Sequence, residues 1–185
     1  MNIIGITGTL GAGKGTIVDY LIQERGYVHY SVRAYIAEEI KRRGLEVNRD
    51  TLTMVANDLR ATHSPSYITD QLFERAKANG QNAVIESVRT PGEIASLRTK
   101  GNFCLFAVDA DQRVRYERIT ERKSETDSVS FATFVANENR EMTSTDPNKQ
   151  NLAECINQAD YVFMNNGTIA DLRNEVEQVL AKLEK

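Results

Sequence analysis

The sequence contains few of the residues that hold structural metals or covalent cross-links. It has two cysteines, two histidines and no tryptophan among 185 residues. Two cysteines are too few for a cysteine-rich zinc site, and without a secretory signal they do not predict a disulfide. We therefore expect Cys104 and Cys155 to be structural side chains, in a fold that depends on its hydrophobic core.

Long apolar runs and a surplus of basic residues are also missing. No apolar stretch approaches the roughly 20 residues that span a bilayer. The net charge of −3 gives none of the basic footprint that nucleic-acid binding needs. The chain opens on Asn2-Ile3-Ile4, with no basic leader before the first apolar run. These absences predict a cytoplasmic protein of one domain that binds neither membranes nor nucleic acids.

Short apolar runs alternate with amphipathic segments along the chain, which is typical of a parallel α/β sheet. The predicted strands are Ile3–Thr7, Tyr27–Tyr30, Asn82–Glu86, Phe103–Asp109 and Asp160–Met164. The predicted helices are 13–25, 33–43, 50–62, 66–79, a segment that opens at Thr90-Pro91, 111–123, 130–142 and 168–183.

The stretch GTLGAGKGT, residues 8–16, lies between the first predicted strand and a predicted helix. A glycine-rich turn at such a place directs backbone N–H groups inward at the positive end of a helix, and Lys14 adds a mobile charge. This order favours a phosphate-binding loop over a dinucleotide-binding turn, because no acidic residue ends the second strand. The predicted donor-binding residues are Gly8, Leu10, Gly11, Ala12, Gly13, Lys14, Gly15 and Thr16.

Gly15 stands where the usual phosphate loop has a magnesium-ligating serine or threonine. The run Gly13-Lys14-Gly15-Thr16 resembles the loop of the adenylate kinase group of nucleoside monophosphate kinases. The resemblance implies that Thr16 lies against the α-phosphate of ATP. It also implies that Mg²⁺ is held largely by phosphates and water, with Thr16 and Glu86 beside them.

The run Ile85-Glu86-Ser87-Val88-Arg89 places an acid at a strand end and an arginine three residues later. It is similar to segments of adenylate kinases and of archaeal adenylate-kinase-related and dephospho-CoA-kinase-like proteins. The resemblance implies that Glu86 lies near the magnesium waters or the acceptor. It also implies that Arg89 holds the acceptor's phosphate, since a guanidinium grips two phosphate oxygens at once.

A short lid is predicted over about 118–142. Arg115, Arg118 and Arg122 fall on one helix face, a spacing that also fits a solvated, salt-bridged helix. Arg118-x-x-x-Arg122 resembles the lid base of adenylate-kinase-like proteins, which implies that both arginines neutralise the transferring phosphoryl group. We expect Arg115 to lie on the surface, and Arg140 to be a further candidate for contact with the phosphates.

After the last predicted strand, Asn165-Asn166-Gly167 resembles a turn that these kinases place beside adenine. Asn165 and Gly167 are therefore predicted to border the base. The stretch between Lys123 and Ser130 is too short for a long lid held by zinc.

The acceptor-binding region, predicted over about 31–80, departs from the resemblance. Where adenylate kinases have Gly-Asp and then an arginine, this chain has Arg33-Ala34 and Ala37. We expect Ser31, Arg33 and Arg60 to bind the acceptor instead.

The sequence predicts a three-layer α/β/α P-loop kinase, and the resemblance implies a five-stranded parallel sheet in the order 2-3-1-4-5. The predicted reaction moves the γ-phosphoryl of ATP, with Mg²⁺, to a nucleoside or deoxynucleoside monophosphate. Such a transfer needs charge and position more than a base, so His29 and His63 receive no catalytic role. Two alternatives are a kinase for another small acceptor, such as dephospho-CoA, and a nucleotide-binding regulator or slow ATPase.

Overall fold

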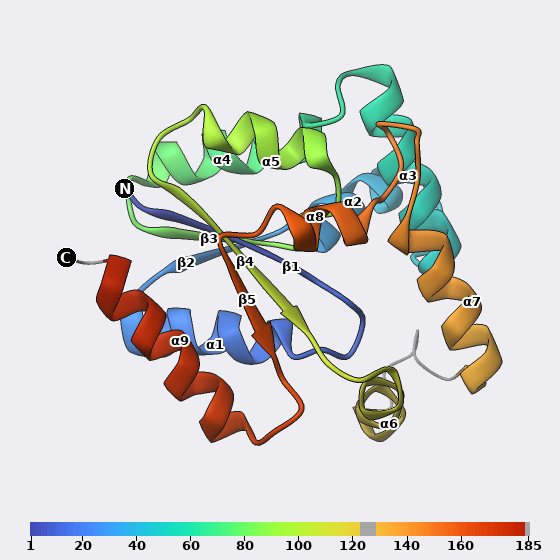
Figure 1. The fold of residues 1–185 in the computed structure, drawn as a ribbon. Coiled ribbons are helices and arrows are strands. Elements are labelled where there is room, and N and C mark those ends of the chain that lie inside the picture. The colour runs from blue at the N-terminus through green and yellow to red at the C-terminus, as the bar shows by residue number, and fades with distance from the viewer. Residues whose placement is uncertain (123–128, 184–185) are drawn as a thin grey trace.

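Five parallel strands form one sheet in the order β2-β3-β1-β4-β5 (Figure 1). The strands are β1 (Ile3–Gly8), β2 (Val28–Ser31), β3 (Ala83–Glu86), β4 (Phe103–Asp109) and β5 (Tyr161–Met164). The predicted sheet and its order are confirmed, and each strand lies within one residue of its predicted bounds. The computed structural model describes residues 1–122 and 129–183. The middle of the predicted lid, and with it the prediction for the stretch from Lys123, lies outside the described residues.

Helices cover both faces of the sheet, which makes the three predicted layers. Figure 1 shows α1 (Lys14–Arg25) and α9 (Ile169–Leu183) together on one side. The other side carries α2 (Val32–Arg42), α4 (Tyr67–Asn79), α5 (Pro91–Arg98) and α8 (Leu152–Asn157). The short helix α8 was not predicted.

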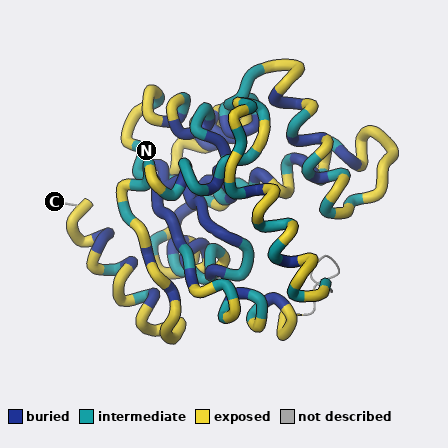
Figure 2. The backbone as a smooth tube through the Cα atoms, turned by 45° about the vertical axis from the view of Figure 1, so that its right-hand side comes forward, coloured by how far each residue is buried: buried dark blue, intermediate teal, exposed yellow. Residues whose placement is uncertain are grey.

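Two hydrophobic clusters, one on each face, explain why the central strands are apolar throughout. Ile3 packs with Leu105 and the helices α2 to α5 on one face. The next residue, Ile4, packs with Phe106 and the helices α1 and α9 on the other. Because successive side chains of a strand point to opposite faces, a strand covered on both sides has no polar face. In Figure 2 the strands accordingly run dark blue, while the helices show yellow outer faces.

Three further helices lie beyond the carboxyl ends of the strands or along the helical layer. The helix α3 (Arg49–Thr62) packs on α2 and α4, and α6 (Gln112–Arg122) follows β4 directly. The helix α7 (Phe131–Met142) packs against α8 and lies at the same end of the molecule (Figure 1). In parallel sheets ligands bind outside the carboxyl ends of the strands, so these helices surround the expected site.

Candidate active site

The glycine loop carries β1 into α1 with positive φ angles at three glycines, Gly8, Gly11 and Gly13. Gly11 and Gly13 have φ angles of +80° and +111°. A Cβ atom on Gly11 would lie 2.5 Å from the carbonyl oxygen of Arg115, and one on Gly13 would lie 2.4 Å from Nδ2 of Asn165. The close packing under the loop, and not only its turn, therefore requires these glycines.

Gly15 is under no such constraint. A Cβ atom there would have no neighbour within 4 Å, and its φ angle is not positive. The fold would therefore accept a side chain at the position that makes this loop unusual.

Alanine substitutions at Gly11 and at Gly15 should differ in their effect on stability. We expect Gly11→Ala to lower the free energy of unfolding by about 1–3 kcal/mol, because it forces a side chain into a left-handed backbone. Gly15→Ala should leave it within about 1 kcal/mol of wild type, because alanine is the better helix former. Urea denaturation measures both, and equal losses in the two variants would contradict this account.

Lys14 lies at the first position of α1, with its ammonium folded back on the loop. Its Nζ donates to the carbonyl oxygens of Gly8 at 2.9 Å and Thr9 at 2.7 Å. Burial, together with the positive charge of Arg89, lowers the pKa of Lys14 from 10.5 to about 7. Because burial removes water from the Lys14 ammonium, a bound anion would stabilise its charged form in place of that water.

This lowered pKa predicts proton uptake on nucleotide binding. Above pH 7 Lys14 is mostly neutral in the free protein, and bound phosphates raise its pKa by stabilising the ammonium. Binding of Mg-ATP at pH 8 should therefore take up close to one proton, and affinity should fall as the pH rises above about 7. Isothermal titration calorimetry in buffers of different ionisation enthalpy measures the uptake. Lys14→Arg, whose guanidinium stays charged, should abolish the uptake, and wild-type heats independent of buffer would refute the prediction.

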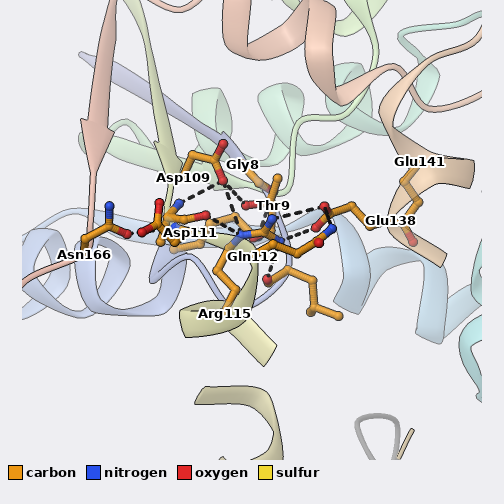
Figure 3. A network of polar contacts seen from close by, with 12 residues as sticks. Gly8, Thr9, Asp109, Asp111, Gln112, Arg115, Glu138, Glu141 and Asn166 are labelled. Carbon is orange, nitrogen blue, oxygen red and sulfur yellow. Dashed lines mark hydrogen bonds and ion pairs between the residues drawn. The ribbon is translucent and has the colours of Figure 1, made fainter. Parts of the chain in front are cut away.

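A polar network supports the loop from below (Figure 3). The Thr9 hydroxyl donates to Oδ1 of Asp109 at 2.5 Å. Arg115 donates from Nε to the carbonyl oxygen of Ala110 at 2.7 Å, and from Nη1 to that of Leu10 at 3.3 Å. The ends of β1 and β4 and the start of α6 are thus bound together under the phosphate loop.

Arg115 corrects one prediction, because it is buried and not on the surface. It is 4% exposed, and its guanidinium pairs with Glu138 of α7 through both Nη1 and Nη2. Gln112 donates to the same carboxylate at 2.8 Å. Figure 3 shows Glu138 beside Arg115, with Glu141 further along the same helix. Arg115 therefore connects α7 to the phosphate loop.

A cavity of about 980 Å³ opens beside the loop and is the candidate site. At the loop end it is lined by the predicted donor residues Leu10, Gly11, Gly13, Lys14, Gly15 and Thr16. Gly8 and Ala12 lie behind this wall, where their carbonyl oxygens accept from Lys14 and Asn165.

The rest of the cavity lining combines apolar side chains with arginines. Its apolar lining is Val32, Ile36, Val47, Leu52 and Ala56, and its arginines are Arg33, Arg49, Arg60 and Arg89. Arg33 makes no side-chain hydrogen bond or ion pair with the described residues. Ser31 does not line the cavity, because its hydroxyl accepts from the backbone N–H of Ala34 and caps α2.

Arg60 lines the cavity but is committed largely to Glu93. Its side chain is 1% exposed, and Nε and Nη2 donate to Oε1 of Glu93 at 3.2 and 2.9 Å. The other oxygen of Glu93 accepts from the backbone N–H groups of Arg89 and Thr90. Nη1 of Arg60 has no partner among the described residues. Through Glu93, Arg60 thus helps to fix the backbone of Arg89, and its Nη1 remains available to a ligand.

Glu86 lines the cavity at the end of β3, beside the second strand. Its Oε2 lies 2.9 Å from Nε2 of His29, a residue for which no role was predicted. Burial raises the pKa of Glu86, but the hydrogen bond and charge of His29 and the charges of Lys14 and Arg89 together bring that pKa below its usual value. Glu86 is therefore ionised at neutral pH.

The predicted lid arginines divide into two groups. Arg118 and Arg122 line the cavity. Arg118 donates from Nη1 to the carbonyl oxygen of Asn165 at 2.9 Å and from Nη2 to that of Gly167 at 3.5 Å, so it also contacts the predicted base turn. Arg140 does not line the cavity; it lies 3.5 Å from Asp50 with its side chain 47% exposed.

Asn165 lies next to the phosphate loop, and neither Asn165 nor Gly167 belongs to the cavity lining. Nδ2 of Asn165 donates to the carbonyl oxygen of Ala12 at 2.7 Å, and the residue is buried. Asn165 thus stabilises the loop whatever its relation to a base.

The cavity offers oxygen ligands of the kind that Mg²⁺ takes together with phosphates and water. Thr16 and Glu86 both line it, and such hard ligands suit Mg²⁺. Within the described residues no group of three or more histidine, cysteine or acidic side chains is arranged to hold a metal ion. The chemistry therefore fits an ion that arrives with a nucleotide.

Comparison with known proteins places the chain in a family. A family model described as an AAA domain matches residues 4–146. A UPF0200 protein of Pyrobaculum aerophilum is 30% identical over 185 residues, with 99% of each chain covered. The chain belongs to the UPF0200 family of AAA-domain proteins.

Solved structures share the fold of this UPF0200 protein. A shikimate kinase from Bacteroides thetaiotaomicron has a TM-score of 0.61 and 14% identity, with 100% of this chain and 99% of that one covered. A gluconokinase from Sinorhizobium meliloti has a TM-score of 0.60 and 16% identity, covering 98% and 93%. The fold is thus that of P-loop kinases. No helix in the described part of the UPF0200 chain combines the length and apolar character needed to cross a membrane.

Two residues of the UPF0200 site were missed from the sequence. Arg49 and Glu141 line the cavity and bond to each other at 2.6 Å. Arg49 lies at the start of a helix, where an arginine is common. Glu141 is one of many acidic residues on helices that the sequence pattern places at the surface, so neither residue stood out. Arg140, the predicted candidate, is the neighbour of Glu141, and of these two residues Glu141 is the one that lines the cavity.

Proposed function

We propose that this UPF0200 protein is a Mg²⁺-dependent kinase that transfers the γ-phosphoryl of ATP to a nucleoside or deoxynucleoside monophosphate. One observation carries the proposal: the phosphate loop, several arginines and a set of apolar side chains line one and the same cavity. The loop suits the polyphosphate of a donor. The arginines suit an acceptor that is itself a phosphate, and the apolar side chains suit its base.

The carboxylates of the cavity support a phosphate acceptor over an alcohol. An alcohol needs a group that accepts its proton during attack, whereas a phosphate oxygen is already ionised. Among the described residues, Glu86 and Glu141 are the carboxylates of the lining. Glu86 is bonded to His29, and Glu141 to Arg49 and Arg89. Both carboxylates therefore already have side-chain partners, and neither is placed as a free base for an alcohol.

The proposed roles follow from position. Lys14 and the loop amides hold the β- and γ-phosphates, and Thr16 and Glu86 hold Mg²⁺ through water, which neutralises charge on the phosphates.

Arg33 and Arg89 bind the acceptor's phosphate. Arg60 contributes through Nη1 and through its hold on Glu93. Arg118 and Arg122 neutralise the transferring group. Four residues with predicted roles do not line the cavity: Arg140, Asn165, Gly167 and Ser31. They keep these roles only if substrate binding moves them toward the cavity.

A second candidate is a kinase that phosphorylates a hydroxyl group. It is favoured by the fold likeness to proteins named shikimate kinase and gluconokinase, and dephospho-CoA belongs to this class of acceptor. A nucleotide-binding regulator or slow ATPase is the third reading.

A substrate panel separates these functions. Purified protein with Mg-ATP is offered nucleoside and deoxynucleoside monophosphates, dephospho-CoA, shikimate and gluconate. ADP and phosphorylated product are both quantified. We expect product from a monophosphate and little ADP without one. Product from a hydroxyl acceptor instead would establish the second candidate, and ADP without any phosphorylated acceptor would establish the third.

A further inference from the structure

Three elements that lie far apart in the sequence meet at one carboxylate in the lining of the cavity. Arg49, at the start of α3, donates from Nη2 to Oε1 of Glu141 at 2.6 Å. Arg89, in the connection between β3 and α5, donates from Nη1 to Oε2 at 3.0 Å. The Glu141 side chain is 8% exposed. One buried carboxylate, near the end of α7, thus holds two cavity-lining arginines in a shared orientation.

The two guanidinium groups retain unused donors. A guanidinium has five N–H groups on three nitrogens, and Arg49 gives Glu141 only one nitrogen. Nε of Arg49 is buried and has no partner among residues 1–122 and 129–183. A buried donor without a partner is costly in a folded protein unless a ligand supplies the acceptor. Arg49 is therefore incomplete without an anion.

The charges point the same way. Glu141 supplies one negative charge between two positive ones, so the group keeps a surplus of positive charge. Arg33 adds a further cation to the lining of the cavity. A phosphate ester, with its three terminal oxygens and its double charge, matches two guanidinium forks better than a neutral hydroxyl does.

We propose that Arg49 binds the phosphate of the acceptor together with Arg89, and that Glu141 is the positioning residue that orients both arginines. The inference rests on the proposed function and deepens it, because it assigns the acceptor's phosphate to a particular pair of side chains. Arg49 supplies from α3 the guanidinium that the resemblance led us to seek on α2.

Steady-state kinetics with the best monophosphate of the panel test the assignment. Arg49→Ala should raise the acceptor KM about 10- to 100-fold, as expected for loss of hydrogen bonds to a charged group, and leave the KM for ATP within about twofold. Arg49→Lys should recover part of the loss, because it restores the charge without the fork. Arg42→Ala is the matched control, since Arg42 is exposed on α2 and bonded to Glu39. An unchanged acceptor KM, or an equal rise in both KM values, would overturn the proposal.

Glu141→Gln distinguishes positioning from competition. If Glu141 orients the arginines, its loss should raise the acceptor KM, and the double variant with Arg49→Ala should be no worse than the more impaired single variant. If Glu141 instead occupies the place of the phosphate, the variant should bind the acceptor more tightly, and its assigned role would be wrong. Glu38→Gln, at an exposed acid paired with Arg75, is the control.

Direct binding separates failure of this inference from failure of the proposed function. Inorganic phosphate is titrated calorimetrically into protein whose loop is saturated with Mg-AMP-PNP. Binding by wild type that Arg49→Ala abolishes would uphold the pair of arginines even if no monophosphate is phosphorylated. Equal binding by both proteins would overturn it even if the kinase activity is established. Far-ultraviolet circular dichroism and melting temperature confirm that each variant is folded.

Discussion

Lys14→Ala should reduce ADP formation about 10³-fold, in line with the loss of a preorganised charge that stabilises a transition state. Lys14 is the cation at the first position of α1, and its ammonium is held within reach of the loop carbonyls. Removing it leaves the amides of the loop but no mobile charge for the outer phosphates. Coupled-enzyme detection of ADP measures the effect for each acceptor of the panel.

The control for this variant is Lys77→Ala, because Lys77 is an exposed residue of α4 outside the cavity lining. Its rate should equal that of wild type. ADP formation by Lys14→Ala within tenfold of wild type would mean that the loop is not the donor site. The folded state of Lys14→Ala is checked by its urea midpoint, which should not fall, because the variant relieves the cost of burying the Lys14 amine away from water.

Arg115→Ala should lower the free energy of unfolding by about 3–5 kcal/mol, the range for removal of one member of a buried ion pair. The variant leaves Glu138 with its side chain 12% exposed and without its cation. It also removes the hydrogen bonds to the carbonyl oxygens of Leu10 and Ala110. Loss of stability should therefore be accompanied by weaker nucleotide binding, since the loop loses its support.

Two comparisons make the Arg115 result interpretable. Arg113→Ala, on the same helix, removes an exposed guanidinium that lies 4.6 Å from the ring centroid of Phe131 and should cost only about 0.5–1 kcal/mol. Replacing both partners, Arg115→Met with Glu138→Leu, should cost less than Arg115→Ala alone, because no charge remains unpaired. A double variant that is less stable than the single one would show that packing, and not the pair, explains the loss.

The sheet and the phosphate loop were predictable because their signals are local. An apolar run such as Phe103–Asp109 has to be covered on both faces, and a glycine loop between a strand and a helix has few other uses. The strand order was available only through the resemblance, because no residue pattern within one strand specifies its neighbours.

The arginines show where sequence reasoning stops. Arg115 was expected on the surface because nearby glutamates suggested a solvated helix, yet its partners are Leu10, 105 residues earlier, and Glu138 on another helix. Arg49 gave no signal at all, since its role depends on Glu141, 92 residues away. Whether a charged side chain is buried depends on the groups that other elements place beside it. The spacing of residues within one helix carries no information on those groups.

The two carboxylates of α7 have a consequence for the dimensions of the site. Glu138 is bonded to Arg115, which supports the phosphate loop, and Glu141 is bonded to Arg49 and Arg89 of the cavity lining. They are three residues apart, which corresponds to about 4.5 Å along a helix axis. One turn of α7 therefore sets the spacing between the arginine that supports the phosphate loop and the two arginines of the cavity lining. A residue inserted into that turn would rotate one of the two carboxylates by about 100° about the helix axis. Only one of the two carboxylates could then keep its contact with an arginine.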